Sequence, residues 1–161
     1  DQVYNGKAKR PKLRLTYGGA VLKEGTDYTA VYKNNKNTGK AKVILTGKGD
    51  YQGTRTVFFR IVPKKATSVK AVHLGNRTVR VTWKRDKKAS GYQIQYSLKK
   101  SFKKGVGKVA VKKNRITSKN LRNLKKGRVY YIRVRAYRVI DGKKAYGPYS
   151  KIKRVSVGKG R

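Results

Sequence analysis

Short runs in which apolar and polar residues alternate are the feature of this sequence that most restricts its fold. The side chains of a strand point alternately to the two faces of a sheet, so a run of this kind fits a half-buried strand. Turn-forming residues such as Gly18-Gly19 separate the runs. The pattern predicts an all-β chain. The runs occupy residues 13–17, 29–33, 40–47, 54–62, 79–83, 91–96, 108–112 and 130–137.

A boundary between two domains is expected at residues 62–66. Pro63 cannot donate a hydrogen bond to a sheet, and the density of basic residues rises directly after it. We therefore predict two domains, residues 1–63 and residues 64–161. The second contains about seven short strands, a number typical of an antiparallel sandwich. The predicted fold class is two antiparallel β-sandwich modules in tandem.

The charge of the chain is strongly positive and unevenly spread. Lysine and arginine number 45 against 6 aspartate and glutamate residues, which gives a formal net charge of +39. Residues 1–63 hold 13 basic and 4 acidic side chains, whereas residues 64–161 hold 32 basic and 2 acidic side chains. A segment with this much charge of one sign repels itself and attracts polyanions. The second domain is therefore expected to bind an anionic partner and to stay monomeric.

Composition excludes several other classes of protein. The patterned apolar residues, the 12 tyrosines and the presence of only 3 prolines argue against disorder. The absence of cysteine excludes disulfides and thiolate metal sites. No stretch approaches the roughly 18 apolar residues of a membrane span, and no signal peptide is visible. We interpret the abrupt start at Asp1 as that of a fragment of a longer protein.

Groups for catalysis or metal binding are scarce. His73 is the only histidine, and as a general base it would need a nearby acid and a nucleophile. Asp86 and Asp141 fall in predicted turns, so we interpret all three as residues without a catalytic role, with the histidine exposed. Calcium prefers about six to eight oxygen ligands, and the acids of the first domain show no ligand spacing. We expect no enzyme activity, no cofactor and no metal site.

One row of outward side chains is a candidate binding surface. If Ile132 and Val134 point into the core, their neighbours must point outward, and Gln93 and Gln95 would face the same side from the adjacent strand. Aromatic and guanidinium groups side by side can stack on sugars or bases and hold phosphate or sulfate with two hydrogen bonds. The residues predicted to bind a polyanion are Arg133, Arg135, Tyr131, Tyr137, Lys99, Lys100, Lys103, Lys104, Lys153 and Arg154.

Residues 66–157 resemble a fibronectin type III domain. Trp83 ends the second strand of this segment, as the core tryptophan of the family does. Leu124 stands six residues before Tyr130, which is similar to the tyrosine corner of the family, and the run that starts at Tyr130 matches its long sixth strand. Lys126 stands where the family often has proline. The resemblance implies a β-sandwich but says little about function, because this fold serves many unrelated proteins.

Further segments resemble bacterial surface proteins. Residues 89–97 and 146–150 are similar to a lysine-rich subgroup of the same family, common in secreted and surface proteins of Firmicutes. Residues 4–8, 22–29 and 46–54 are similar to a small Ig-like or MBG-like repeat of Gram-positive exported proteins. That repeat normally has a few more residues at its start. The resemblance implies an extracellular, modular and largely non-catalytic segment.

These observations together predict a non-catalytic adhesion segment of a bacterial surface or secreted protein, in which the second domain binds an anionic polymer. Arg133, Arg135 and the loop of residues 99–104 are expected to lead the binding. Teichoic acid of the bacterial wall, sulfated or sialylated host glycan and extracellular DNA are candidate partners, since electrostatic attraction does not distinguish them. Three alternatives stay open: a passive spacer, an ancillary module of a secreted hydrolase, and a ligand for a host receptor with an acidic patch.

Overall fold

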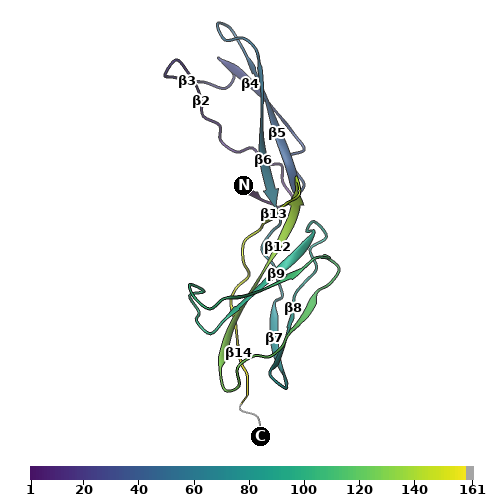
Figure 1. Cartoon of the computed structure of the whole chain (residues 1–161). Coiled ribbons are helices and arrows are strands. Elements are labelled where there is room, and N and C mark those ends of the chain that lie inside the picture. Colours follow the sequence, from purple (N-terminus) through teal and green to yellow (C-terminus); the bar gives the residue numbers. More distant parts are fainter. Residues whose placement is uncertain (159–161) are drawn as a thin grey trace. The chain divides into compact units, whose positions relative to one another are not determined.

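The computed structural model describes residues 1–158, and every regular element among them is a β-strand (Figure 1). The all-β prediction is therefore confirmed. Within this described range there is no helix of the length and apolar character that crossing a membrane requires. The chain divides into two compact units, Asp1–Val62 and Pro63–Arg161. The last three residues of the predicted second domain, 159–161, lie outside the described residues.

The first unit contains a four-stranded sheet and a separate hairpin. The sheet has the strand order β1-β6-β5-β4, and β2 pairs with β3 in the hairpin. The strands are β1 (Gln2–Val3), β2 (Leu15–Tyr17), β3 (Ala20–Leu22), β4 (Tyr28–Lys33), β5 (Gly39–Gly47) and β6 (Thr54–Val62). Pairing is antiparallel except between β1 and β6, which run parallel. Alternation along a strand carries no information about the direction of its partner, so the sequence did not indicate this exception.

The core of the first unit is small. Tyr28, Val43 and Leu45 are buried, and apolar side chains of the hairpin and of β6 pack against them while staying partly exposed. Val57 lies opposite Val43 in the register of β5 and β6. These two residues share the inner face of the sheet, as the alternation predicts.

The second unit is built from two antiparallel sheets. One has the strand order β11-β8-β7, and the other has the order β10-β9-β12-β13, with β14 also paired to β12. β13 and β14 pair with opposite ends of β12, and the segment between them runs along its middle. The strands are β7 (Lys70–Gly75), β8 (Thr78–Thr82), β9 (Gly91–Ser97), β10 (Gly107–Val111), β11 (Ser118–Leu121), β12 (Val129–Ile140), β13 (Lys143–Tyr146) and β14 (Lys153–Ser156).

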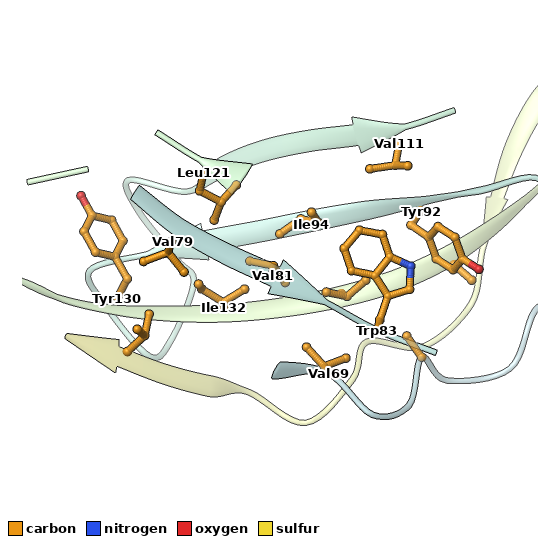
Figure 2. Close-up of a cluster of buried hydrophobic side chains, with 14 of the residues drawn as sticks. Val69, Val79, Val81, Trp83, Tyr92, Ile94, Val111, Leu121, Tyr130 and Ile132 are labelled. Atoms are coloured by element: carbon orange, nitrogen blue, oxygen red, sulfur yellow. The ribbon is translucent and has the colours of Figure 1, made fainter. Parts of the chain in front are cut away.

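Side chains from both sheets form the hydrophobic core of the second unit (Figure 2). Val79 and Val81 of β8 are fully buried, and so are Ile94 of β9 and Ile132 of β12. Because residues two apart on a strand share a face, the residues between these buried ones must point to the outer face of their sheet. The core therefore fixes which side chains of β8, β9 and β12 lie on the outer faces.

Two further contacts of this core involve aromatic side chains that the sequence singled out. The Trp83 ring packs against the Tyr92 ring, with 5.2 Å between the ring centroids. The backbone N–H of Lys125 donates a hydrogen bond to the Tyr130 hydroxyl at 3.1 Å. This bond is the tyrosine corner that the spacing of Leu124 and Tyr130 predicts.

Candidate anion-binding surface

The outer face of the five-stranded sheet carries the row of residues predicted to bind a polyanion. Arg133 and Arg135 alternate with fully buried neighbours along β12, so both arginines point away from the core. Arg133 lies opposite Gln95 of β9, and Arg135 lies opposite Gln93. The predicted orientation of these four side chains is confirmed.

Both arginines are stacked against aromatic rings. The guanidinium carbon of Arg133 lies 4.1 Å from the ring centroid of Phe102 and 3.9 Å from that of Tyr149. The guanidinium carbon of Arg135 lies 4.4 Å from the Tyr149 centroid and 3.8 Å from that of Tyr146. Tyr149 therefore contacts both charged groups. We call the series Phe102, Arg133, Tyr149, Arg135 and Tyr146 the guanidinium–aromatic ladder.

Hydrogen bonds to two glutamines fix the orientation of the ladder. The Nε and Nη2 groups of Arg133 both donate to Oε1 of Gln95, at 2.9 and 2.8 Å. The Nε group of Arg135 donates to Oε1 of Gln93 at 3.0 Å, and the Tyr149 hydroxyl donates to the same oxygen at 3.3 Å. These amide and aromatic partners are neutral. They hold the two arginines in place without cancelling their positive charge.

Burial and charge act in opposite directions on Tyr149. Burial raises the pKa of its hydroxyl above the ordinary value of 10.0, while the Arg135 and Arg133 guanidiniums oppose that rise. The hydroxyl is therefore protonated at neutral pH and can donate its hydrogen bond to Gln93.

Phe102 joins a basic loop to the ladder. Its ring is buried, although it lies in the connection between β9 and β10, and its φ of 53° is in the left-handed region that bulky residues rarely adopt. The Ser97 hydroxyl accepts a hydrogen bond from the backbone N–H of Lys99 at 3.1 Å and donates one to the carbonyl of Lys104 at 3.3 Å. These contacts hold the loop next to the arginine row. The exposed cations of the loop are Lys99, Lys100, Lys103 and Lys104.

The other residues predicted to bind a polyanion do not all lie on the outer face of the sheet. Tyr131 and Arg154 are opposite each other on β12 and β14, so they share the outer face, where Arg154 is exposed. Lys153 is exposed too, but it lies opposite a buried residue of β12 and so belongs to the other side of the strand. Lys108 of β10 lies opposite Gln95 and adds an exposed cation to the outer face.

Tyr137 corrects the prediction of an exposed ring. The residue is only 2% exposed. Its hydroxyl donates a hydrogen bond to the carbonyl of Val111 at 3.4 Å, and its ring packs on Tyr146 with 5.7 Å between centroids. β13 pairs with this end of β12, which brings Tyr146 over the ring. Tyr137 therefore supports the last ring of the ladder and is not accessible to a ligand.

Sequence reasoning missed the aromatic members of the ladder, Phe102, Tyr146 and Tyr149. The two tyrosines fall in a segment noted only for its resemblance to a subgroup, and Phe102 stands among lysines in a loop. An apolar ring in a loop of charged residues is unusual unless the fold gives it a partner. That mismatch is the signal that could have identified Phe102.

The comparisons with known proteins agree with this architecture. The family model for the fibronectin type III domain matches residues 64–151, which contain the core tryptophan, the tyrosine corner and the whole ladder. The chain belongs to the fibronectin type III family. No curated protein matches the chain.

Two solved fibronectin type III structures illustrate the likeness. The FN1-FN3 domains of chicken CNTN1 are 25% identical with a TM-score of 0.55, and the match covers 76% of this chain and 44% of that chain. The fn3 domain of human contactin 1 is 25% identical with a TM-score of 0.54, and the match covers 63% of this chain and 84% of that chain. The match therefore spans less than half the length of the chicken structure.

His73 of the fibronectin type III domain is less exposed than predicted, and the turn residue Asp86 is nearly buried. Asp86 is 9% exposed, and its Oδ1 accepts a hydrogen bond from the backbone N–H of Lys88 at 2.8 Å. The backbone N–H of Asp86 donates to the hydroxyl of Tyr92 at 2.7 Å, which draws the turn onto the core. His73 is half-buried on β7 rather than exposed. Residues 1–158 contain no group of three His, Asp or Glu side chains placed to hold a metal ion.

Proposed function

We propose that the chain is a non-catalytic binding segment of a bacterial surface or secreted protein, whose fibronectin type III domain binds polymers that carry phosphate or sulfate groups. The observation that carries the proposal is a pair of arginines, Arg133 and Arg135, held on an outer face by neutral partners and bordered by exposed lysines. The 32 basic and 2 acidic residues from position 64 onward favour the same partner.

The physical argument is one of preorganisation. A guanidinium that is already fixed loses little side-chain freedom when it binds, and its planar fork matches the oxygens of phosphate or sulfate. Each guanidinium has five N–H donors, of which Arg133 uses two and Arg135 one on the glutamines. Donors remain on both for a ligand. Teichoic acid, sulfated glycan and nucleic acid all present the required oxyanions.

The structure revises the set of residues that we propose to contact the polymer. Tyr137 leaves the set because it is buried, and Lys153 leaves it because it lies on the other side of its strand. Lys108 enters it as an exposed cation in the row of Arg133. The proposed contact residues are Lys99, Lys100, Lys103, Lys104, Lys108, Tyr131, Arg133, Arg135 and Arg154.

A pair of charge-matched variants tests the proposal. The face variant carries Lys103→Ser, Lys104→Ser and Arg154→Ser. The control variant carries Lys87→Ser, Lys126→Ser and Lys143→Ser, which remove the same charge from exposed positions outside the proposed contact set. We expect affinity for heparin and for oligothymidylate, measured by anisotropy at physiological salt, to fall about tenfold or more in the face variant and about threefold or less in the control. Equal losses would contradict a defined face.

A passive spacer is the second candidate, and the ladder itself favours it. Arg133 and Arg135 already make internal contacts, and a spacer requires nothing more of them than to stabilise the domain. Arg133→Lys separates the two functions because lysine keeps the charge but has no planar fork. A binding site predicts a selective loss of affinity for one polymer class. A spacer predicts binding that follows only the charge density of the polymer and is the same in the variant.

We also propose that the unit Asp1–Val62 is an Ig-like or MBG-like surface repeat and that the chain is extracellular. The support is the resemblance of residues 22–29 and 46–54 to such repeats, together with the lysine-rich character of residues 89–97. Labelling of intact source cells with a membrane-impermeant amine reagent tests the location. Label on this protein before lysis is expected, and label only after lysis would contradict the proposal.

A further inference from the structure

A second group of cations lies on the three-stranded sheet of the fibronectin type III domain. Arg80 of β8, Lys119 of β11 and Arg122 line a hollow of about 530 Å³ together with Ser118 and Asn120. Lys119 lies opposite the buried Val81 and so belongs to the other side of its strand, which leaves Arg80 and Arg122 as the outward cations of the hollow. Neither acid of this domain, Asp86 or Asp141, lines the hollow. Every charged residue of its lining is therefore basic.

The side chains of this hollow are ordered by the strand pairing. Arg80 lies opposite Asn120 in the register of β8 and β11, and its Nε donates a hydrogen bond to Asn120 Oδ1 at 3.3 Å. Only one N–H of the guanidinium is used in this bond, so the others remain for a ligand. Arg80 thus resembles the ladder arginines, because a neutral amide holds it across two strands.

The two cationic groups are on opposite sides of the sandwich. Val79 and Val81, on either side of Arg80, point into the same core as Ile132 and Val134, on either side of Arg133. Two sheets whose inner residues share a core turn their other faces in opposite directions. Arg80 and Arg133 therefore face away from each other, with the core between them.

We infer that the fibronectin type III domain has two oxyanion-binding faces and bridges two separate phosphate- or sulfate-bearing chains. This inference rests on the proposed function and adds a second site and a consequence, crosslinking of the polymer. Packed sheets are about 10 Å apart, and the side chains on both faces add to that distance. Charges are screened beyond about 8 Å at physiological ionic strength. An anionic chain on one face therefore repels a chain on the other only weakly.

Energy transfer between two short oligonucleotides measures bridging directly. The probes are oligothymidylates of about 6 nucleotides, a length within the range that small binding modules cover, with a donor dye on one pool and an acceptor on the other. Added to an equal mixture, the full chain is expected to raise energy transfer. The signal should be highest near two probes per protein and should decline with excess protein, when each molecule holds a single probe.

A variant that removes cations of the hollow tests whether the energy transfer depends on this second face. Arg80→Ser and Arg122→Ser together are expected to reduce energy transfer about tenfold while the anisotropy of a single probe still reports binding. The control Lys87→Ser and Lys126→Ser removes the same charge and should keep most of the transfer. Arg122→Glu serves as a second test, with the same expected direction, where the double variant does not fold.

The outcomes separate this inference from the proposed function. Energy transfer that persists in the second-face variant, or that falls equally in the control, overturns the inference, while the binding measured by anisotropy leaves the proposed function standing. Absence of any probe binding by the full chain at physiological salt overturns both. Transfer that is lost in the second-face variant alone supports both.

Discussion

Removal of Tyr149 is the most informative perturbation of the ladder. The ring contacts two guanidiniums, and its hydroxyl donates to Gln93. A cation–π contact is worth about 0.5–2 kcal/mol, and a hydrogen bond contributes about 0.5–1.5 kcal/mol. Tyr149→Ala should therefore lower the free energy of unfolding by about 2–3 kcal/mol. For a domain of roughly 100 residues this corresponds to a fall in Tm of about 10–15 °C.

Trp83 provides the assay. It is the only tryptophan of the sequence and is buried in the core of the second unit, so its fluorescence reports the unfolding of that unit alone. Tyr149→Phe is the matched control, because it keeps the ring between Arg133 and Arg135 and removes only the hydroxyl. The control should lose about 1 kcal/mol or less.

A double-mutant cycle decides whether the stacking itself carries the effect. Arg133→Met keeps most of the length of the side chain but removes the guanidinium. Combined with Tyr149→Ala, it should show a coupling free energy of about 0.5–1.5 kcal/mol. Coupling near zero, or equal losses in Tyr149→Ala and Tyr149→Phe, would refute the argument that the ladder stabilises the domain.

Three further predictions follow from single contacts. Tyr130→Phe removes the hydroxyl that accepts the Lys125 N–H and should cost about 0.5–1.5 kcal/mol in urea unfolding; an unchanged midpoint would contradict a stabilising tyrosine corner. Phe102→Ala changes no charge, yet it should weaken heparin binding by about threefold to tenfold, because the loop of Lys99 to Lys104 loses the ring that holds it against Arg133. An unchanged affinity would show that this contact does not contribute to binding. Burial raises the pKa values of Tyr92 and Tyr137 in the folded state. The stability that they contribute is therefore fully present below about pH 10, the pKa of an unfolded tyrosine, and is lost as the pH rises through the higher pKa values of the folded state. A urea midpoint that does not fall between about pH 9 and about pH 11 would contradict this direction.

The alternation of apolar residues correctly predicts the face of the sheet on which each residue lies, but it does not predict how deeply that residue is buried. It places Ile132 and Val134 inward and Arg133 and Arg135 outward, as the structure has them. It fails at Tyr137 because the same face of β12 is open at one end and covered by Tyr146 of β13 at the other. Whether an outward residue is exposed depends on the partner strands, which the local pattern does not specify.

The aromatic half of the ladder could not be derived from local patterns. Phe102 and Tyr149 lie in connections far from Arg133 in the sequence, and they reach it only because the chain folds back over β12. The parallel pairing of β1 with β6 likewise depends on contacts between distant segments. The burial of Asp86 also depends on a contact with another segment, since its backbone N–H donates a hydrogen bond to the hydroxyl of Tyr92 on the next strand.

The salt dependence of binding tests the central claim most directly. If fixed arginines and surrounding lysines bind the oxyanions of a polymer, counterion release requires affinity to fall steeply with salt. With about four or more oxyanion contacts, the affinity of the full chain for heparin or oligothymidylate should fall at least about 30-fold between about 50 and 200 mM salt. An affinity that hardly changes over this range would show that charge does not drive the interaction and would contradict the proposed function.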